Sequence, residues 1–480
     1  MATMKPPVPP ARASQPRAPL PPRRATPRPP EPTRVPEPAA PSTAAAPPTA
    51  AAPTRKAPRV SVPSASVAPE RAEPTKPVAA VVAVRRIFAA ETGNYFLLLG
   101  TTLFLVAFGL VMVLSSSSIE SYLQNDSDFF AAFSKQGLYA LIGVPAMLLV
   151  SRLPLAFWKK WAWLFLIVAM GLQLLVFVPG IGWGYGGNTN WIRIAGISGQ
   201  PSELVKTALI IWTAWVLWTK ASLLNDWRHV LLPIAPVGGL AIGFVLLGGD
   251  LGTAIVMLSI VFGALFFAGV KIRFLVLPAI AVAAFGIIFA LAGGSRSERI
   301  SAWLGGCADV DTIDACWQPV HGTWALAAGG VFGVGLGNSK AKWSWLPEAD
   351  NDYIFAIIGE ELGLIGAIVV LALFIVLAFS FIRIIRSTDD QFSRIATSGV
   401  MIWIIAQALI NIAVVLGLLP VLGVPLPLIS AGGSALISTL IAIGLVLSFA
   451  RKPVVDDGFT PQTPAQQSRL AASERARSHR

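Results

Sequence analysis

Apolar runs of about 20 residues recur along the chain from Tyr95 to Ala450, and they constrain its fold more than any other feature. A helix of that length crosses the roughly 30 Å hydrocarbon core of a bilayer. Only 13% of the residues are charged, whereas a soluble protein has about 25%. The runs also lack the alternation over about ten residues that marks the strands of a membrane β-barrel. The sequence therefore predicts an all-α polytopic membrane protein and excludes a soluble globular enzyme.

Ten transmembrane helices are predicted, and a large extracytoplasmic loop, 294–352, separates the seventh from the eighth. Their approximate bounds are 95–115, 135–151, 160–179, 203–219, 230–248, 251–269, 273–293, 353–382, 396–418 and 428–450. The eighth is long enough to tilt or to extend beyond the bilayer. The fifth and sixth meet at a tight turn.

Basic residues in the short loops predict the orientation. Loops that follow even-numbered spans carry ten Lys and Arg residues, whereas the other short loops carry only Lys135 and Arg193. We therefore expect both termini in the cytoplasm of a multi-pass protein of the cytoplasmic membrane. The segment 294–352 and the turn at Asp250 are expected on the outer side.

The net charge of +12 lies in the tails, since residues 1–86 carry a net +10 and residues 87–450 a net −1. The first 77 residues also hold 23 of the 38 prolines, a composition typical of disorder. We expect 1–86 to be a disordered cytoplasmic tail, either a spacer or a docking segment, and 453–480 a second, short one. The membrane domain is predicted at 87–452. Anionic lipid is the expected partner of the basic tails, and no nucleic acid is expected.

The two cysteines, Cys307 and Cys316, both fall in the predicted outer loop. An oxidising compartment permits a disulfide between them, and two free thiols are the alternative. The three histidines are far apart in the sequence, so we expect no zinc site held by protein ligands alone.

Ionisable residues at the ends of spans indicate function, because charge inside a membrane is costly. Glu203 and Lys206 lie three residues apart, on one face of a helix, and Ser202 can cap that helix. The pair is either a capping carboxylate with a snorkelling lysine or a polar site that faces a cavity. Asp250 lies among glycines between two spans, where it can cap a helix, act as a base, or do both.

Two further segments combine polar residues with helix breakers. Acids occupy 348–361, and the helix dipole explains Asp352 but not Glu360 and Glu361, for which a hydrogen-bonded pair between helices is the alternative. The prolines, glycines and hydroxyls of 425–434 predict a broken helix that lines a cavity. A glycine-rich stretch, 329–337, does not match a P-loop.

Six blocks of sequence, in order, resemble the SEDS family of shape, elongation, division and sporulation proteins. They are Asn190–Ile192, Gln200–Lys206, Asp250–Ala254, Ala328–Gly337, Asp352–Gly363 and Leu428–Ser434. The forms of the last two blocks resemble the FtsW-type, or division, branch more than the RodA-type, or elongation, branch. Gly249 and Asn190 depart from the residues usual in the family, and the segment with the two cysteines is an unusual insertion.

The resemblance implies a peptidoglycan glycosyltransferase at the division septum, which polymerises lipid II into β-1,4 glycan strands with inversion and releases polyprenyl diphosphate. A lipid II flippase and a non-enzymatic divisome scaffold are the alternatives. Acids clustered at the outer edge favour the enzyme. The sequence has no transpeptidase motif, so the resemblance implies a class B penicillin-binding protein as partner, together with lipid II, the nascent glycan chain and other divisome membrane proteins.

The resemblance also suggests roles for particular residues. Asp250 is the expected base, Lys206 is expected to contact diphosphate, and Glu203 is expected to orient Lys206 or to help Asp250 hold Mg²⁺ or Mn²⁺ with the substrate's diphosphate. No organic cofactor is expected. The remaining residues expected to bind substrate are Asn190, Arg193, Gln200, Ser202, Lys340, Lys342, Asp352, Ser430, Gly432, Gly433 and Ser434.

Overall fold

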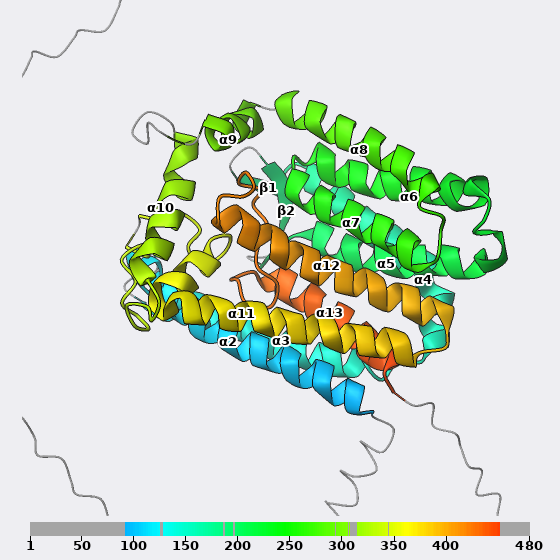
Figure 1. Cartoon of the computed structure of the whole chain (residues 1–480), viewed down its shortest axis with the longest axis horizontal. Coiled ribbons are helices and arrows are strands. Elements are labelled where there is room, and N and C mark those ends of the chain that lie inside the picture. Colours follow the sequence, from blue (N-terminus) through cyan, green and yellow to red (C-terminus); the bar gives the residue numbers. More distant parts are fainter. Residues whose placement is uncertain are drawn as a thin grey trace, which may run out of the picture. The chain divides into compact units, whose positions relative to one another are not determined.

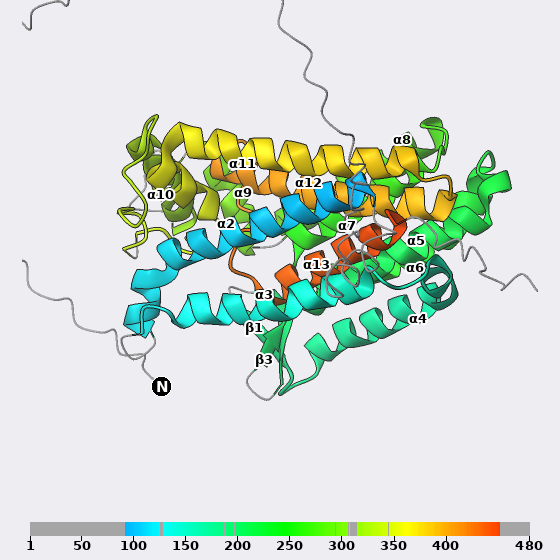
Figure 2. The ribbon, with the colours of Figure 1, turned by 90° about the horizontal axis from the view of Figure 1, so that it is seen from below.

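The computed structural model describes residues 92–451 except 125–127, 186–187, 195–196, 293, 306, 308–313 and 344. Both predicted tails, 1–86 and 453–480, lie outside the described residues. Long helices run back and forth along one direction (Figures 1 and 2). They are α2 (Gly93–Gln124), α3 (Ala131–Val150), α4 (Leu155–Leu174), α5 (Pro201–Thr219), α6 (Trp227–Leu247), α7 (Leu251–Phe267), α8 (Arg273–Ala292), α11 (Ile354–Ser387), α12 (Gln391–Val415) and α13 (Gly433–Phe449).

Each of these helices coincides with one predicted span. Within the described residues, seven are long and apolar enough to cross a membrane: α2, α3, α4, α6, α8, α11 and α12. Two more, α7 and α13, are apolar but have 17 residues each. The remaining one, α5, carries Glu203 and Lys206 in its first two turns. The polytopic helical fold is confirmed, and the count of ten spans stays a prediction.

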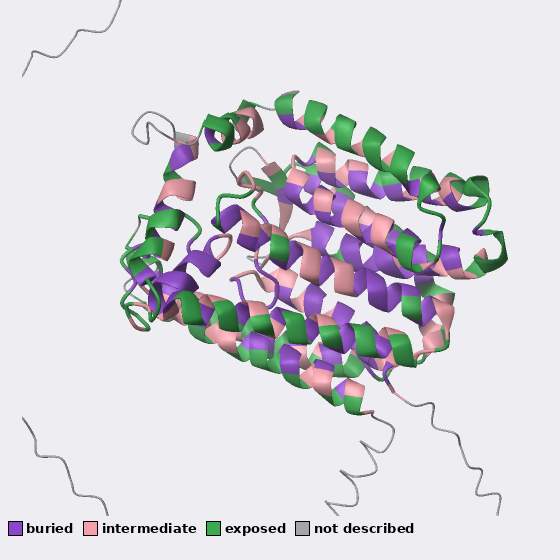
Figure 3. Ribbon diagram, viewed as in Figure 1, coloured by how far each residue is buried: buried purple, intermediate pink, exposed green. Residues whose placement is uncertain are grey.

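Burial divides the helices into inner and outer ones. Residues of α5 and α12 are largely buried, whereas α8 lies at the edge of the bundle with most of its surface exposed (Figure 3). Large apolar side chains on the outer helices are open to the surroundings, such as Leu141 at 71% and Leu277 at 74% exposure. Exposed apolar surface of this extent fits contact with lipid rather than water.

The two ends of the described core meet. The hydroxyl of Thr92, just before α2, donates a hydrogen bond of 2.8 Å to the carbonyl oxygen of Ala450, just after α13. The first and last long helices therefore have their outer chain ends at the same end of the bundle. At the opposite end lie a small sheet and two shorter helices, and we call it the cavity end (Figure 1).

The sheet was not predicted, since the apolar runs of the sequence indicated helices alone. Its antiparallel strands are β1 (Gly182–Tyr185), β2 (Asn188–Ile194) and β3 (Ile197–Gly199), in the order β1-β2-β3. Trp183 pairs with Trp191, and Arg193 with Ser198. The sheet fills the connection between α4 and α5, so it can brace the start of α5.

The segment 294–352 contains two helices, α9 (Gly294–Gly305) and α10 (Asp314–Gly329). A disulfide joins Cys307 to Cys316 across the connection between them, with Cα atoms 5.4 Å apart. Covalent closure of this short loop restricts how far the two helices can separate.

A break in α11 explains the glycine-rich stretch. Gly363, with φ +69°, interrupts the helix, a backbone conformation that glycine adopts at little cost. The carbonyl oxygens of Glu360 and Glu361 accept from the N–H groups of Val334 and Gly335, at 2.9 and 3.0 Å. Residues 329–337 thus supply the backbone hydrogen bonds that the broken helix lacks.

Candidate functional site

A cavity of about 990 Å³ lies at the cavity end, between α7, α8, α9 and the sheet. One part, here the apolar arm, is lined by side chains of α6, α7 and α8: Leu246, Ala254, Ile255, Leu258, Val282, Ala283, Phe285, Ile287 and Phe289. The other part, here the polar end, is lined by Asn188, Asn190, Gln200, Asp250, Arg296, Arg299, Gln318, Glu348, Asn351 and Asp352. A ligand with an apolar tail and a polar head matches this division.

Asp250 is the N-cap of α7 and a wall of the polar end. One carboxylate oxygen, Oδ1, accepts from the backbone N–H of Thr253 at 2.8 Å. The other, Oδ2, accepts from Nε2 of Gln200 at 3.0 Å. Burial raises the pKa of Asp250 above its ordinary value, although the hydrogen bonds from Thr253 oppose the shift. Asp250 is therefore both a helix cap and an oriented carboxylate more basic than usual.

The turn before Asp250 is held by strand β2. The N–H of Thr189 donates to the carbonyl oxygen of Gly248 at 2.9 Å. The Asn190 amide, oriented to donate, lies 3.1 Å from the carbonyl oxygens of Thr189 and Gly248. Gly249 has φ +89°, and a Cβ there would lie 2.6 Å from Oδ1 of Asn188. Asn190 therefore supports the turn that presents Asp250.

Glu203 and Lys206 form a buried ion pair. Nζ of Lys206 lies 2.8 Å from Oε1 of Glu203, and their side chains are 1% and 3% exposed, lysine first. The ammonium also donates to Oε1 of Gln407 at 3.0 Å and sits 4.5 Å from the Trp403 ring centroid. Neither member of the pair lines the cavity. The pairing was predicted, and the contact of Lys206 with diphosphate stays a prediction.

Ser202 also differs from its predicted role. The N-cap of α5 is Gln200, and Ser202 lies inside the helix with a buried hydroxyl that has no hydrogen-bond partner among the described residues. The backbone N–H of Gln200 donates to the Ser434 hydroxyl at 3.1 Å. Gln200 thus links α5, α13 and Asp250.

The segment before α13 is non-helical, which confirms the broken helix predicted at 425–434. The Ser430 hydroxyl donates to the carbonyl oxygen of Asn351 at 2.7 Å. Gly432 lines the cavity, and a Cβ on Gly433 would lie 2.2 Å from the ring of Tyr139. A larger residue there would require the Tyr139 ring of α3 to move away from the start of α13.

Asp352 lies in the polar end, just before α11. Its carboxylate oxygen Oδ1 is buried and has no hydrogen-bond partner among the described residues, while its backbone oxygen accepts from Asn411 at 2.7 Å. Burial, followed by the negative charge of Glu348, raises the pKa of Asp352 to about 7, against the opposing charge of Arg299. Asp352 can therefore change charge near neutral pH.

Of the thirteen predicted binding residues, Asn190, Gln200, Asp352 and Gly432 line the cavity, and the other nine, which include Arg193, Lys340 and Lys342, do not. The Arg193 guanidinium stacks 4.5 Å from the Trp183 ring centroid, and Lys340 is exposed. Nζ of Lys342 lies 3.5 Å from Oε1 of Glu361 and donates to the carbonyl oxygen of Gly337 at 2.6 Å.

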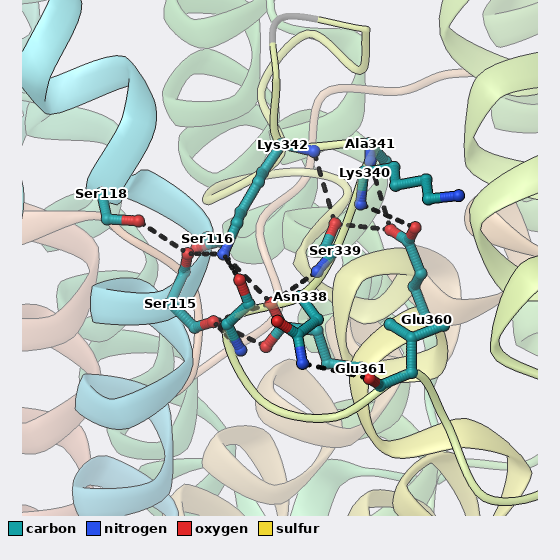
Figure 4. Close-up of polar contacts among 12 residues, drawn as sticks. Ser115, Ser116, Ser118, Asn338, Ser339, Lys340, Ala341, Lys342, Glu360 and Glu361 are labelled. Carbon is teal, nitrogen blue, oxygen red and sulfur yellow. Dashed lines mark hydrogen bonds and ion pairs between the residues drawn. The ribbon is translucent and has the colours of Figure 1, made fainter.

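Figure 4 shows Lys342 within a polar cluster that ties α2 to α11. The Ser115 hydroxyl of α2 donates to the Glu361 carboxylate at 2.6 Å, and the Lys340 N–H donates to Glu360 at 2.9 Å. Glu360 and Glu361 thus hold the segment 339–342 and α2, which is more than the interhelical pair predicted as an alternative.

No group of three His, Cys, Asp or Glu side chains suited to a metal occurs among the described residues. Glu203, which was expected to help Asp250, is occupied by Lys206. Of the two predicted ligands, only Asp250 lies on the cavity.

Arg296 and Arg299 were not among the residues predicted for the site. Both are on α9 and line the polar end. Their spacing of three residues, directly after an apolar span, is the signal that could have identified them, because it puts both on one helical face.

Most of the chain is similar in sequence to known proteins. The family model for FtsW, RodA and SpoVE, described as "Cell cycle protein", matches residues 95–453. The chain belongs to this family. The SEDS resemblance is thereby confirmed, and with it a multi-pass membrane protein.

Curated relatives of the family cover about three quarters of the chain. A "Probable peptidoglycan glycosyltransferase FtsW" of Mycobacterium tuberculosis is 39% identical over 358 residues, 75% of this chain and 68% of that protein. "Stage V sporulation protein E" of Bacillus subtilis is 36% identical and covered to 98%. Among solved structures, "Structural coordination of polymerization and crosslinking by a peptidoglycan synthase complex" includes a chain with TM-score 0.60 and 25% identity, covering 74% of this chain and 96% of that one.

Proposed function

We propose that the chain is a peptidoglycan glycosyltransferase of the FtsW type, which polymerises lipid II into β-1,4-linked glycan strands. The observation that carries the proposal is Asp250, an oriented carboxylate of raised pKa in a cavity with an apolar arm and a polar end. Lipid II has the same division, with a polyprenyl chain at one end and sugars at the other. The names of the curated relatives support this activity.

In the proposed reaction the 4-hydroxyl of the acceptor GlcNAc attacks C1 of the donor MurNAc. The new C1–O bond forms as the bond from C1 to the diphosphate oxygen breaks, and the hydroxyl proton passes to Asp250. A displacement with inversion requires one base and no carboxylate nucleophile. Thr253 and Gln200 hold the two carboxylate oxygens in place, so each oxygen keeps a lone pair for the proton.

A divalent cation, Mg²⁺ or Mn²⁺, is proposed to bind only together with the diphosphate of the substrate. Asp250 would supply one protein ligand, and diphosphate oxygens the others, as is usual for Mg²⁺ bound with a phosphorylated substrate. No group of three side chains suited to a metal occurs among the described residues, and no step above depends on the ion.

The cavity end is proposed to face outward and both termini the cytoplasm, at the division septum. The ten basic loop residues support this orientation. Cysteine labelling from outside should mark introduced cysteines between 300 and 345, and those near 225 and 390 only after permeabilisation. Labelling of position 225 in intact cells would contradict the proposed orientation.

A class B penicillin-binding protein is the proposed partner, because the chain has no transpeptidase motif of its own. The matched synthase complex, whose title couples polymerisation to crosslinking, supports it. The surfaces proposed to meet this partner are α11, α12 and the segment 294–352. Lipid II, the nascent glycan and other division proteins are the further proposed partners.

The test compares two aspartates that cap helices. Asp250→Asn keeps the size of the side chain and removes its basicity, while Asp226→Asn changes the N-cap of α6, whose carboxylate accepts from Arg228 N–H at 3.0 Å. With lipid II supplied in detergent and the partner present, Asp250→Asn should lower polymerisation by about 10²–10⁴-fold, and Asp226→Asn should polymerise like the wild type.

Other outcomes separate the alternatives. Wild-type protein that makes no polymer but scrambles lipid II across vesicles would be a flippase. Wild-type protein that does neither would be a scaffold. Normal polymerisation by Asp250→Asn would place the base elsewhere in the cavity.

A further inference from the structure

Arg296 and Arg299 are the basic residues that line the cavity in the described part of the chain. They share one face of α9, since they lie three residues apart. Lys206 and Lys342, by contrast, are each paired with a buried carboxylate away from the cavity. An anionic group inside the cavity would therefore meet its positive charge on α9.

Arg296 lies where the apolar arm ends and the polar end begins. Its guanidinium carbon is 4.5 Å from the ring centroid of Phe289, a residue of the arm. Its Nη2 donates to the carbonyl oxygen of Gly249 at 3.0 Å, directly before Asp250. One arginine thus contacts both the wall of the arm and the turn that presents the proposed base.

We infer that Arg296 and Arg299 form the binding site for the diphosphate of a polyprenyl-diphosphate-linked sugar, an inference that rests on the proposed function. In such a substrate the diphosphate joins the lipid chain to C1 of the sugar. In the cavity Arg296 likewise stands between the apolar arm and Asp250, and Arg299 lines the polar end one helical turn further along α9. Substrate and site therefore have the same order: chain, diphosphate, reacting carbon.

The chemistry of arginine suits this role. A guanidinium has five N–H donors in a planar fork that matches phosphate oxygens. One bond to Gly249 leaves four donors on Arg296, so a phosphate can bind without release of the turn. The acids Asp250, Glu348 and Asp352 share the polar end, and without the arginines their charge would repel a diphosphate.

The same contacts act during the reaction. When the bond from C1 to the diphosphate oxygen breaks, the electron pair stays on that oxygen and the diphosphate gains negative charge. Positive groups already in place stabilise this charge in the transition state. Because Arg296 is bonded to Gly249, it also sets the distance between the leaving group and Asp250, and so acts as a binding and a positioning residue.

The test measures binding rather than turnover. The full chain in detergent is titrated calorimetrically with undecaprenyl diphosphate and, separately, with undecaprenyl monophosphate. Arg296→Gln and Arg299→Gln should each weaken diphosphate binding about tenfold or more, and monophosphate binding less. Arg296→Lys keeps the charge and should fall between wild type and Arg296→Gln.

Arg273→Gln is the matched control. Arg273 also stacks on a phenylalanine, 4.9 Å from the Phe274 ring centroid, but at the other end of α8. It should bind both lipids like the wild type. If Arg296→Gln does not elute as a monodisperse folded protein, Arg299→Gln and Arg296→Lys decide.

Unchanged diphosphate affinity in both glutamine variants would overturn the inference, as would an equal loss for the two lipids. Failure of the proposed function has a different signature. If the wild-type protein binds diphosphate through the arginines but never polymerises lipid II, the diphosphate site stands and the proposed glycosyltransferase activity is wrong. If the wild-type protein polymerises lipid II but diphosphate binding does not depend on the arginines, only the inferred diphosphate site is wrong.

Discussion

Replacing Lys206 by methionine should destabilise the protein through the carboxylate that it leaves behind. The change keeps an unbranched side chain and removes the ammonium that lies 2.8 Å from Oε1 of Glu203. The second oxygen of Glu203, Oε2, is buried and already has no hydrogen-bond partner among the described residues. Breaking a buried ion pair by removing one partner costs about 3–5 kcal/mol, so Lys206→Met should lose that much free energy of unfolding.

The double variant Glu203→Gln/Lys206→Met should recover most of the loss. With both charges gone, neither side chain bears the cost of an unpaired buried charge, and such replacements are often close to neutral. The assay is a double-mutant cycle, with the free energy of unfolding measured by SDS titration in mixed micelles. Lys220→Met, at the C-cap of the same helix, is the control and should lose only about 0.3–1 kcal/mol.

Polymerisation by the double variant separates packing from substrate binding. If Lys206 acts only through the buried pair, the double variant is both stable and active with lipid II and the partner. A stable but inactive double variant would indicate that the Glu203–Lys206 pair contributes to substrate binding or catalysis. A Lys206→Met protein as stable as the wild type would refute the reasoning about the buried pair itself.

Three further outcomes are expected. Gly363→Ala should lower the free energy of unfolding in the same titration by at least about 1–2 kcal/mol. The φ of Gly363 is +69°, and a Cβ there would lie 2.4 Å from the backbone N of Gly333. The control Gly239→Ala, where a Cβ would have nothing within 4 Å, should leave the free energy of unfolding unchanged. Burial raises the pKa of Asp352 to about 7. The contribution of the neutral acid to folding stability is therefore complete below about pH 4, the pKa of an unfolded aspartate. This contribution is lost as the pH rises through 7. Asp352→Asn should therefore flatten the fall in melting temperature from pH 5 to 8. Cys316→Ser should cost about 2–3 kcal/mol in the titration and remove the sensitivity of the wild type to reductant.

The sequence predicted the long helices because their apolar runs are set by the membrane, a constraint that acts on each run separately. Helix capping was one of the alternatives given for Asp250, and the structure shows that cap, a role that depends on neighbours along the chain. The small sheet was missed because a four-residue strand such as Gly182–Tyr185 has little local preference and depends on pairing with β2. Local sequence patterns thus predict the elements whose formation does not depend on distant parts of the chain.

The side-chain environment of the site was less predictable. The spacing of Glu203 and Lys206 fixed their common face but not which side of α5 would be buried, and contacts with Trp403 and Gln407 on α12 decide that. Arg296 gained its role through Gly249, 47 residues earlier in the chain. Both outcomes depend on tertiary contacts that no local pattern encodes.

The position of α8 has a consequence for how substrate concentration should be counted. This helix forms one wall of the apolar arm, and only 11% of its most apolar stretch is buried within the protein. A lipid-linked substrate that enters past α8 arrives by diffusion within one leaflet, so its surface density, and not its molarity in solution, sets the occupancy of the site. In micelles the corresponding variable is the mole ratio of substrate to detergent. Adding detergent at constant bulk substrate should slow polymerisation as a competitive inhibitor would, although nothing new binds to the polar end.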